Sequence, residues 1–165
     1  MSPIELLDLK GPWAGIGSRE APMSVQVLMA RYGRTVYDHM LGQLHSGDAI
    51  ASDFAFWVGA RLSTNFDVLK AKIILSRNGY QSRWQDTNLG FYNAKAFDQT
   101  LWDRANQLAF EARKGFYGLG TGGINLVTRN AFQLLDLDLE HPVSKCIYWG
   151  IPQGKTEKVR GGTNV

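Results

Sequence analysis

Residues 12–18 of the chain read PWAGIGS, a short apolar run that ends in two glycines and a serine. Such a run is typical of a buried strand that feeds a tight turn. A helix is expected directly afterwards, because apolar side chains recur at helical spacing from Ser24 to Leu44 and Pro22 stands close to the start. A buried strand, a glycine turn and an amphipathic helix together predict an α/β protein with a parallel sheet.

The same alternation continues along the rest of the sequence. Further strands are expected at residues 43–46, 72–75 and 146–149, and further helices at 54–62, 96–114 and 129–135, the last capped by Thr128. The polar residues 78–90 are expected to form a loop long enough to act as a lid. The sequence therefore predicts one doubly wound, Rossmann-like α/β domain over residues 1–165, with a mostly parallel sheet and helices on both faces.

Composition excludes several classes of protein. The chain has 165 residues, 44% of them hydrophobic and 20% charged, which fits a globular domain that needs no disulfide or metal to be stable. No apolar stretch is long enough to span a bilayer, and no secretion signal is visible, so we expect a cytoplasmic protein with no membrane partner. The net charge of +3 is too small to indicate a nucleic-acid-binding protein by itself.

Metal and cysteine chemistry find little support in the sequence. The histidines, His39, His45 and His141, lie far apart with no second ligand at metal spacing, so each is expected at the surface or an interface, and no metal or other cofactor is expected. Cys146 is the only cysteine and lies in an apolar strand, so it is expected to be buried and inert.

Two glycine-containing turns are candidates for phosphate binding. Backbone N–H groups of such turns, together with the positive end of the following helix, attract anions at the carboxyl edge of a parallel sheet. The first turn holds Gly15, Gly17, Ser18 and Arg19, where N–H and hydroxyl donors and a guanidinium are expected to meet the ligand. An ordinary structural turn would have the same glycines.

The second turn begins at Ser46 and Gly47 and continues through Asp48 to Asp53. Asp53 is placed to order this turn, and ordinary helix capping is the simpler explanation of its position. A third segment, Gly161-Gly162-Thr163, is either another phosphate-binding turn or a flexible tail.

The order and content of these segments resemble the SLOG superfamily, which includes the Lonely Guy phosphoribohydrolases and the DNA-processing protein A family, and within it small phage-encoded proteins of the latter type. The similarity lies in G-x-G-S-R at Gly15 to Arg19, in SGDAIASDFAFWVGA from Ser46, in Arg129-Asn130 and in the final G-G-T. Asp48 replaces a family glycine, which puts a carboxylate beside the expected phosphate. The glutamate that Lonely Guy enzymes use is not in this sequence, so the chain is either incomplete or a shortened member.

The resemblance implies a pocket for a nucleotide-derived ligand, such as a nucleoside phosphate or an ADP-ribose-like molecule. Arg19 and Arg129 are expected to neutralise phosphate, Asn130 to contact a ribose or a base edge, and a homodimer or larger oligomer is expected from the family. One alternative is an N-glycosidic hydrolase, for which Asp48 and Asp53 are the candidate catalytic carboxyl groups. Of the two, Asp53 is our choice for the catalytic residue. Another is single-stranded DNA binding, which the weak net charge disfavours.

Aromatic residues near the 78–90 loop are expected in the core rather than as a base-stacking platform: Trp84, Phe91, Tyr92, Trp102, Phe116 and Tyr117.

Overall fold

Five parallel strands form one sheet, in the spatial order β4-β3-β2-β1-β5. The computed structural model describes residues 10–152, apart from the side chain of Phe97, and residues 1–9 and 153–165 lie outside the described part. The strands are β1 (Gly11–Gly17), β2 (Gly42–Ser46), β3 (Ala71–Leu75), β4 (Phe91–Asn93) and β5 (Lys145–Trp149). The prediction of an α/β protein with a parallel sheet is confirmed.

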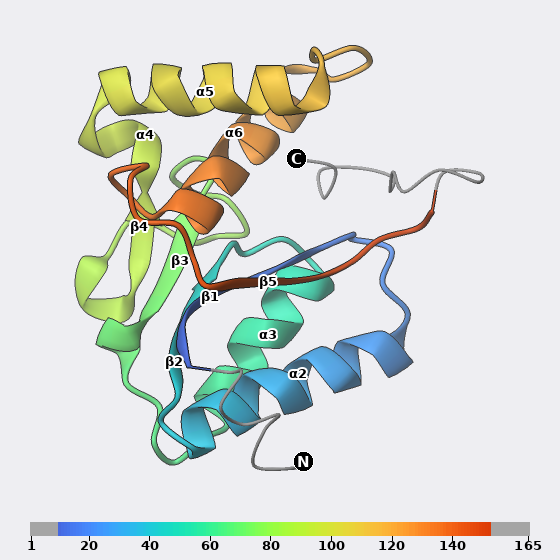
Figure 1. Ribbon diagram of the computed structural model, residues 1–165, viewed down its shortest axis with the longest axis vertical. Helices are drawn as coiled ribbons and strands as arrows, with labels where there is room; N and C mark the ends of the chain where they lie inside the picture. Colours follow the sequence, from blue (N-terminus) through green and yellow to red (C-terminus); the bar gives the residue numbers. More distant parts are fainter. Residues whose placement is uncertain (1–9, 153–165) are drawn as a thin grey trace.

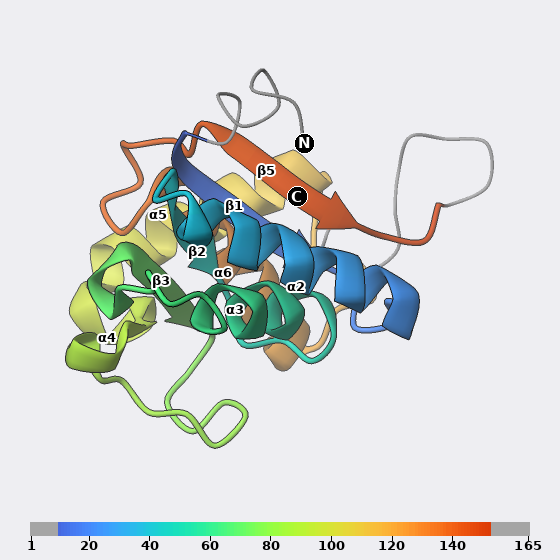
Figure 2. The ribbon, with the colours of Figure 1, turned by 90° about the horizontal axis from the view of Figure 1, so that it is seen from below.

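Helices cover both faces of the sheet, as a doubly wound fold requires. One face carries α2 (Met23–Asp38) and α3 (Ser52–Arg61), and the other carries α5 (Gln99–Arg113) and α6 (Thr121–Leu135), with the short α4 (Ala94–Phe97) before α5. Figure 1 shows the two helical layers on opposite sides of the sheet, and Figure 2 looks onto α2 and α3. Two 3₁₀ turns, η1 (Val68–Lys70) and η2 (Thr87–Leu89), precede β3 and β4. Among the described helices, none combines the length and apolar character that a bilayer span requires.

The direction in which strands are added reverses beside β1. From β1 to β4 the strands follow one another across the sheet, whereas β5 returns to the other side of β1, where Trp149 pairs with Gly17. In open α/β sheets, ligands bind outside the carboxyl ends of the strands at such a reversal, because the two connections there leave to opposite faces and open a crevice. The boundary between β1 and β5 is therefore where the fold favours a binding site.

A close crossing of α2 and α3 fixes the position of α3. A Cβ on Gly59 would overlap the backbone of Ala30, and a Cβ on Gly33 would overlap the carbonyl group of Phe56. Phe56 is fully buried and its ring lies 5.5 Å from that of Trp13 in β1. Because α3 is held this closely, its first turn is fixed at the carboxyl edge of the sheet.

Two predicted helices end earlier or are divided. The helix predicted over residues 24–44 ends at Asp38, because Met40 adopts a left-handed φ of 52° and β2 begins two residues later. The helix predicted over residues 96–114 is divided into α4 and α5, because the Asp98 side chain caps α5 by accepting hydrogen bonds from two backbone N–H groups. Local polar capping therefore overrides an uninterrupted apolar pattern in the second case.

One helix begins earlier than predicted, and one strand was not predicted. α6 begins at Thr121, so Thr128 lies inside the helix and does not cap it. Gly122 and Gly123, which were expected to lie before the helix, belong to its first turn. β4 was not predicted, because three residues are too few for a periodic pattern.

Two side chains lie opposite to their predicted environments. Cys146 is exposed, because β5 is an edge strand. His45 is 1% exposed, because it lies on the inner strand β2, and burial lowers the pKa of its imidazole.

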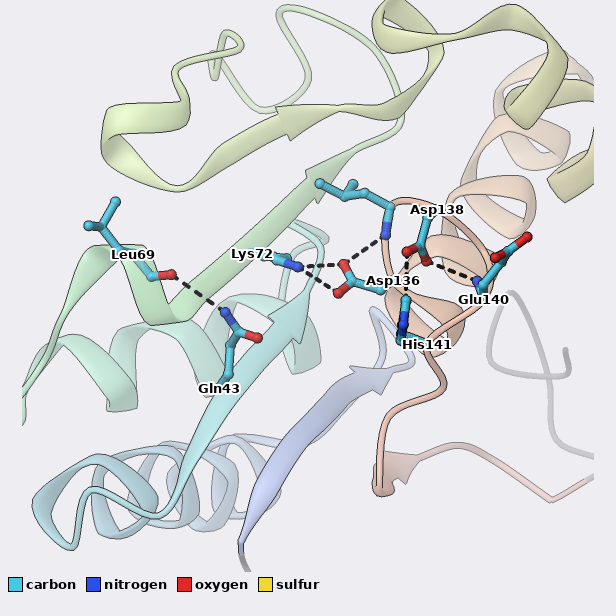
Figure 3. Close-up of polar contacts among 8 residues, drawn as sticks. Gln43, Leu69, Lys72, Asp136, Asp138, Glu140 and His141 are labelled. Atoms are coloured by element: carbon cyan, nitrogen blue, oxygen red, sulfur yellow. Dashed lines mark hydrogen bonds and ion pairs between the residues drawn. The ribbon is translucent and has the colours of Figure 1, made fainter.

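Polar contacts fasten the C-terminal end of α6 to the sheet. Lys72 on β3 donates to both carboxylate oxygens of Asp136 at 2.6 Å, just beyond the last turn of α6 (Figure 3). In the turn that follows, Asp138 contacts His141 at 2.6 Å. On the neighbouring strand, Gln43 reaches the carbonyl oxygen of Leu69. The Lys72–Asp136 ion pair holds the C-terminal end of α6 against β3, at the end opposite to the carboxyl edge of the sheet.

Candidate functional site

The Asp53 carboxylate joins three elements at the carboxyl edge. Its Oδ1 accepts from the backbone N–H of Gly17 at 3.1 Å, and its Oδ2 accepts from Nη2 of Arg129 at 3.1 Å. The backbone N–H of Ala49 also donates to this carboxylate. Asp53 therefore connects the end of β1, the turn after β2 and the helix α6. Burial raises the pKa of the Asp53 carboxyl, and the Arg129 guanidinium opposes this rise.

The first predicted turn is tied into the protein by its own backbone. The N–H of Gly17 donates to Asp53, and the N–H of Ser18 donates to the carbonyl oxygen of Trp149 at 2.9 Å. Both N–H groups therefore donate to groups of the protein itself, whereas the sequence analysis expected donors of Gly17 and Ser18 to face a ligand. The Ser18 hydroxyl accepts from the backbone N–H of Glu20 at 3.1 Å, and the side chain of Arg19 is exposed.

Glycines in this region are required by close packing. A Cβ on Gly15 would lie 2.7 Å from the Phe56 ring, and a Cβ on Gly17 would overlap Ser52. The hydroxyl of Ser52 donates to the carbonyl oxygen of Ser18 at 2.8 Å, so the first turn rests directly on the start of α3. These contacts hold the two turns together as one rigid edge.

The second turn is held at its start by a hydrogen bond to β1, and its backbone is strained at Ala51. The hydroxyl of Ser46 donates to the carbonyl oxygen of Gly15 at 2.5 Å, and a Cβ on Gly47 would overlap the Arg129 guanidinium. Ala51 has φ 72° and ψ −97°, a conformation that costs a residue with a side chain about 1–3 kcal/mol. The turn keeps this conformation because its neighbours on both sides are held.

The starts of α2 and α3 carry different charges. α2 has no acidic residue in its first turn, and the exposed Arg19 and Glu20, whose charges are opposite, precede it. α3 has Asp53 in its first turn, and Asp48 lies in the loop before it. Because the N-terminus of a helix attracts anions and carboxylates repel them, an anionic ligand is favoured at α2 over α3.

Asp48 forms an ion pair with a residue that the sequence analysis did not single out. Nε of Arg83, in the loop between β3 and β4, donates to Oδ2 of Asp48 at 3.3 Å. Arg83 also lies over the rings of Trp57 and Phe91, 5.1 and 5.5 Å from their centroids. Burial raises the pKa of the Asp48 carboxyl, and the Arg83 guanidinium opposes this rise. Phe54 and Gln81, which the sequence analysis also did not single out, line a cavity together with Asp48.

The other predicted residues are partly brought to this edge. Arg129 and Asn130 come to it from α6, each 3% exposed, with Nη2 of Arg129 also donating to Oδ1 of Asn130 at 3.0 Å. Gly161, Gly162 and Thr163 lie outside the described residues. Of the aromatic residues near the loop, Phe91 and Trp102 are buried, as expected, whereas Trp84 and Tyr117 are largely exposed.

The fold and the site define a doubly wound α/β protein whose two turns at the carboxyl edge are locked together by a buried Asp–Arg pair. Comparison of the chain with protein-family models, curated proteins and solved structures found no match.

Proposed function

We propose that this protein binds a nucleotide-derived phosphate ligand, with its phosphate at the start of α2. The observation that supports this most directly is the start of α2, which has no acidic residue in its first turn. The exposed Arg19 and Glu20 precede it, and the Arg19 guanidinium is the group that would contact the phosphate. The helix end also lies beside the reversal between β1 and β5, where doubly wound folds bind ligands. The resemblance to SLOG proteins adds the expectation that the phosphate belongs to a nucleoside phosphate or an ADP-ribose-like molecule.

A thermal-shift screen tests this function. The purified chain is titrated with nucleoside monophosphates, NAD, ADP-ribose and cyclic nucleotides, and each mixture is then separated by chromatography. A ligand present at 100 times its Kd stabilises the native state by about 2.7 kcal/mol, which raises the Tm of a domain of this size by roughly 5–10 °C. The absence of a shift with every phosphate compound would contradict the proposal.

Two arginines on neighbouring parts of the chain provide a matched pair of variants. Arg19→Gln removes the guanidinium beside the proposed phosphate and should weaken binding about tenfold, the loss expected for one charge-assisted hydrogen bond. Arg31→Gln removes the same charge from an exposed position within α2 and should leave the affinity unchanged. Equal effects of the two substitutions would indicate a general charge effect and not a phosphate site.

N-glycosidic hydrolysis is a second candidate function, and one observation favours it. Asp48 lines a cavity and has a raised pKa, as expected for a carboxyl group that protonates a leaving base. Both aspartates are buried, but both carboxylate oxygens of Asp53, our choice from the sequence, are bonded to Gly17 and Arg129. Asp48 lines the cavity and is therefore the better placed of the two. Release of a free base by the wild type, abolished in Asp48→Asn while binding persists, would support hydrolysis; recovery of every ligand intact would exclude it for the compounds tested.

The resemblance to small phage-encoded proteins suggests a use for binding without turnover. A protein that holds a nucleotide signal of the host intact would remove that signal from its receptor. Tight binding with intact recovery of the ligand is the result that this use requires. The homodimer expected from the resemblance is tested separately by light scattering of the purified chain.

A further inference from the structure

A cavity of about 240 Å³ lies between the second turn and the loop that joins β3 to β4. It is lined by Asp48, Ile50, Phe54, Gln81 and Arg83. Because β3 is next to β2 and β1 lies on the other side of β2, this cavity and the start of α2 flank the second turn from opposite sides. The cavity has no part in the phosphate site proposed above.

One wall of the cavity is apolar and aromatic although it faces solvent. Ile50 is 59% exposed and Phe54 is 40% exposed. The ring of Phe54 lies 5.7 Å from that of Trp57, so the buried indole supports it from within α3. A supported and exposed aromatic face is suited to stacking against a flat ring.

The lining of the cavity also presents a donor next to an acceptor. Arg83 is held in place by its ion pair with Asp48 and by the rings of Trp57 and Phe91. Only Nε of the guanidinium is used in that ion pair, so its four terminal N–H groups are left for a ligand. Oδ1 of Asp48 accepts no hydrogen bond from any described residue, while Oδ2 accepts from Arg83.

We propose that this cavity binds the base of the nucleotide, with the ring stacked on Phe54 and its edge read by Asp48 and Arg83. The inference rests on the proposed function and assigns the part of the ligand that the phosphate site leaves open. The edge would present an N–H donor to Asp48 beside a carbonyl or ring-nitrogen acceptor for Arg83. Every common nucleobase has such an adjacent pair, whereas a phosphate or a sugar offers no flat face to Phe54.

The two positions offer a ligand different groups. The cavity combines the exposed Phe54 ring with an Asp48–Arg83 ion pair whose charges cancel, whereas the start of α2 offers a helix N-terminus with no carboxylate in its first turn. The base therefore lies at the cavity and the phosphate at the start of α2.

Isothermal titration of the full chain with a defined panel tests the assignment. The panel contains AMP, GMP, CMP and UMP, ribose 5-phosphate, which has no ring base, and purine riboside 5′-phosphate, whose base has acceptors but no N–H on its edge. The best of the four nucleotides should bind about tenfold or more tighter than either comparator, since stacking and one edge contact each contribute at least that much. Ribose 5-phosphate or the unsubstituted purine nucleotide binding as tightly as the best nucleotide would overturn the proposal.

Two phenylalanines on different helices give a matched control. Phe54→Ala should weaken the best nucleotide about tenfold and leave ribose 5-phosphate unchanged. Phe110 on α5 is 47% exposed and packs on Phe116 at 5.4 Å, so Phe110→Ala removes a similarly exposed and supported ring away from the cavity and should change neither affinity. Asp48→Asn should abolish the preference for the best nucleotide over the unsubstituted purine. Equal losses in Phe54→Ala and Phe110→Ala, or an unchanged preference in Asp48→Asn, would also overturn the proposal.

The panel separates failure of this inference from failure of the proposed function. If ribose 5-phosphate and all nucleotides bind equally, the phosphate site stands and the base site is wrong. If free nucleosides bind as tightly as their monophosphates, with the same loss in Phe54→Ala, the base site stands and the phosphate site is wrong. If no compound binds, both are wrong.

Discussion

The Arg129 guanidinium occupies the space that a side chain on residue 47 would need, so Gly47 and Arg129 form a packed pair at the carboxyl edge. The same space lies next to the Asp53 carboxylate, which would also meet a Cβ on Gly47. Glycine is required at this position by contact with α6. The second turn and α6 are consequently one packed unit, although they are far apart in the sequence.

Gly47→Ala is expected to destabilise the protein by about 2–3 kcal/mol, because the added methyl group must displace a buried ion pair. Urea unfolding followed by fluorescence measures the change. Gly122→Ala is the control, since a Cβ there meets nothing within 4 Å and alanine favours the helix; it should be neutral or stabilise by up to about 1 kcal/mol. A Gly47→Ala variant as stable as Gly122→Ala would contradict the packing described.

Arg129→Met is expected to cost about 3–5 kcal/mol, because it leaves the Asp53 carboxylate buried without its cation. The double variant Asp53→Asn/Arg129→Met should be more stable than Arg129→Met alone, since no uncompensated charge remains. Unfolding free energies of the wild type, Asp53→Asn, Arg129→Met and the double variant form the required cycle. Additive effects would mean that the two side chains do not interact.

Ala51→Gly is expected to stabilise the protein by about 1 kcal/mol, because glycine adopts the positive φ of 72° without strain. Ala112→Gly provides the opposite case. It places glycine at an exposed position inside α5 and should cost about 0.5–1 kcal/mol. The sign of the change in unfolding midpoint distinguishes strain at Ala51 from a general effect of glycine.

Asp48→Asn is expected to gain stability relative to the wild type as pH rises above about 4. The folded-state pKa of Asp48 is raised above 3.8 by burial, so the folded wild type binds more protons than the unfolded chain in this window and loses stability as pH rises. Asp138→Asn should behave in the opposite way. Hydrogen bonding lowers the pKa of Asp138, so the wild type gains stability as pH rises towards 3.8 and the variant does not. Parallel pH profiles for the two variants would contradict the assigned environments.

The sequence predicted the layers of the fold and the two turns well, because both depend on local patterns. An apolar run before glycines is a strand and turn signal at β1, and Ser46 to Asp53 gives the same signal at β2. That Asp53 orders the second turn agrees with its contact to the N–H of Ala49. Its contact to the backbone N–H of Gly17, at 3.1 Å, had no local signal in the sequence.

Long-range pairing explains the parts that sequence reasoning did not find. Asp48 and Arg83 are 35 positions apart, and only the folded sheet brings the loop after β3 against the turn after β2. Arg129 was expected to meet a phosphate, and the structure gives it a carboxylate, Asp53, as its partner. An arginine near a glycine turn has the same sequence signature in both cases, because both partners are anions.

The position of β5 beside β1 has a consequence for how the chain assembles. Ser144, just before β5, bonds to Pro12 in β1, and 132 positions separate them. During synthesis, β1 to β4 and their helices emerge first, and the second edge of β1 stays uncovered until nearly the whole described chain has left the ribosome. Closing so long a loop is slow, which makes the docking of β5 the natural late step of folding and the uncovered edge of β1 the natural point of contact for a chaperone.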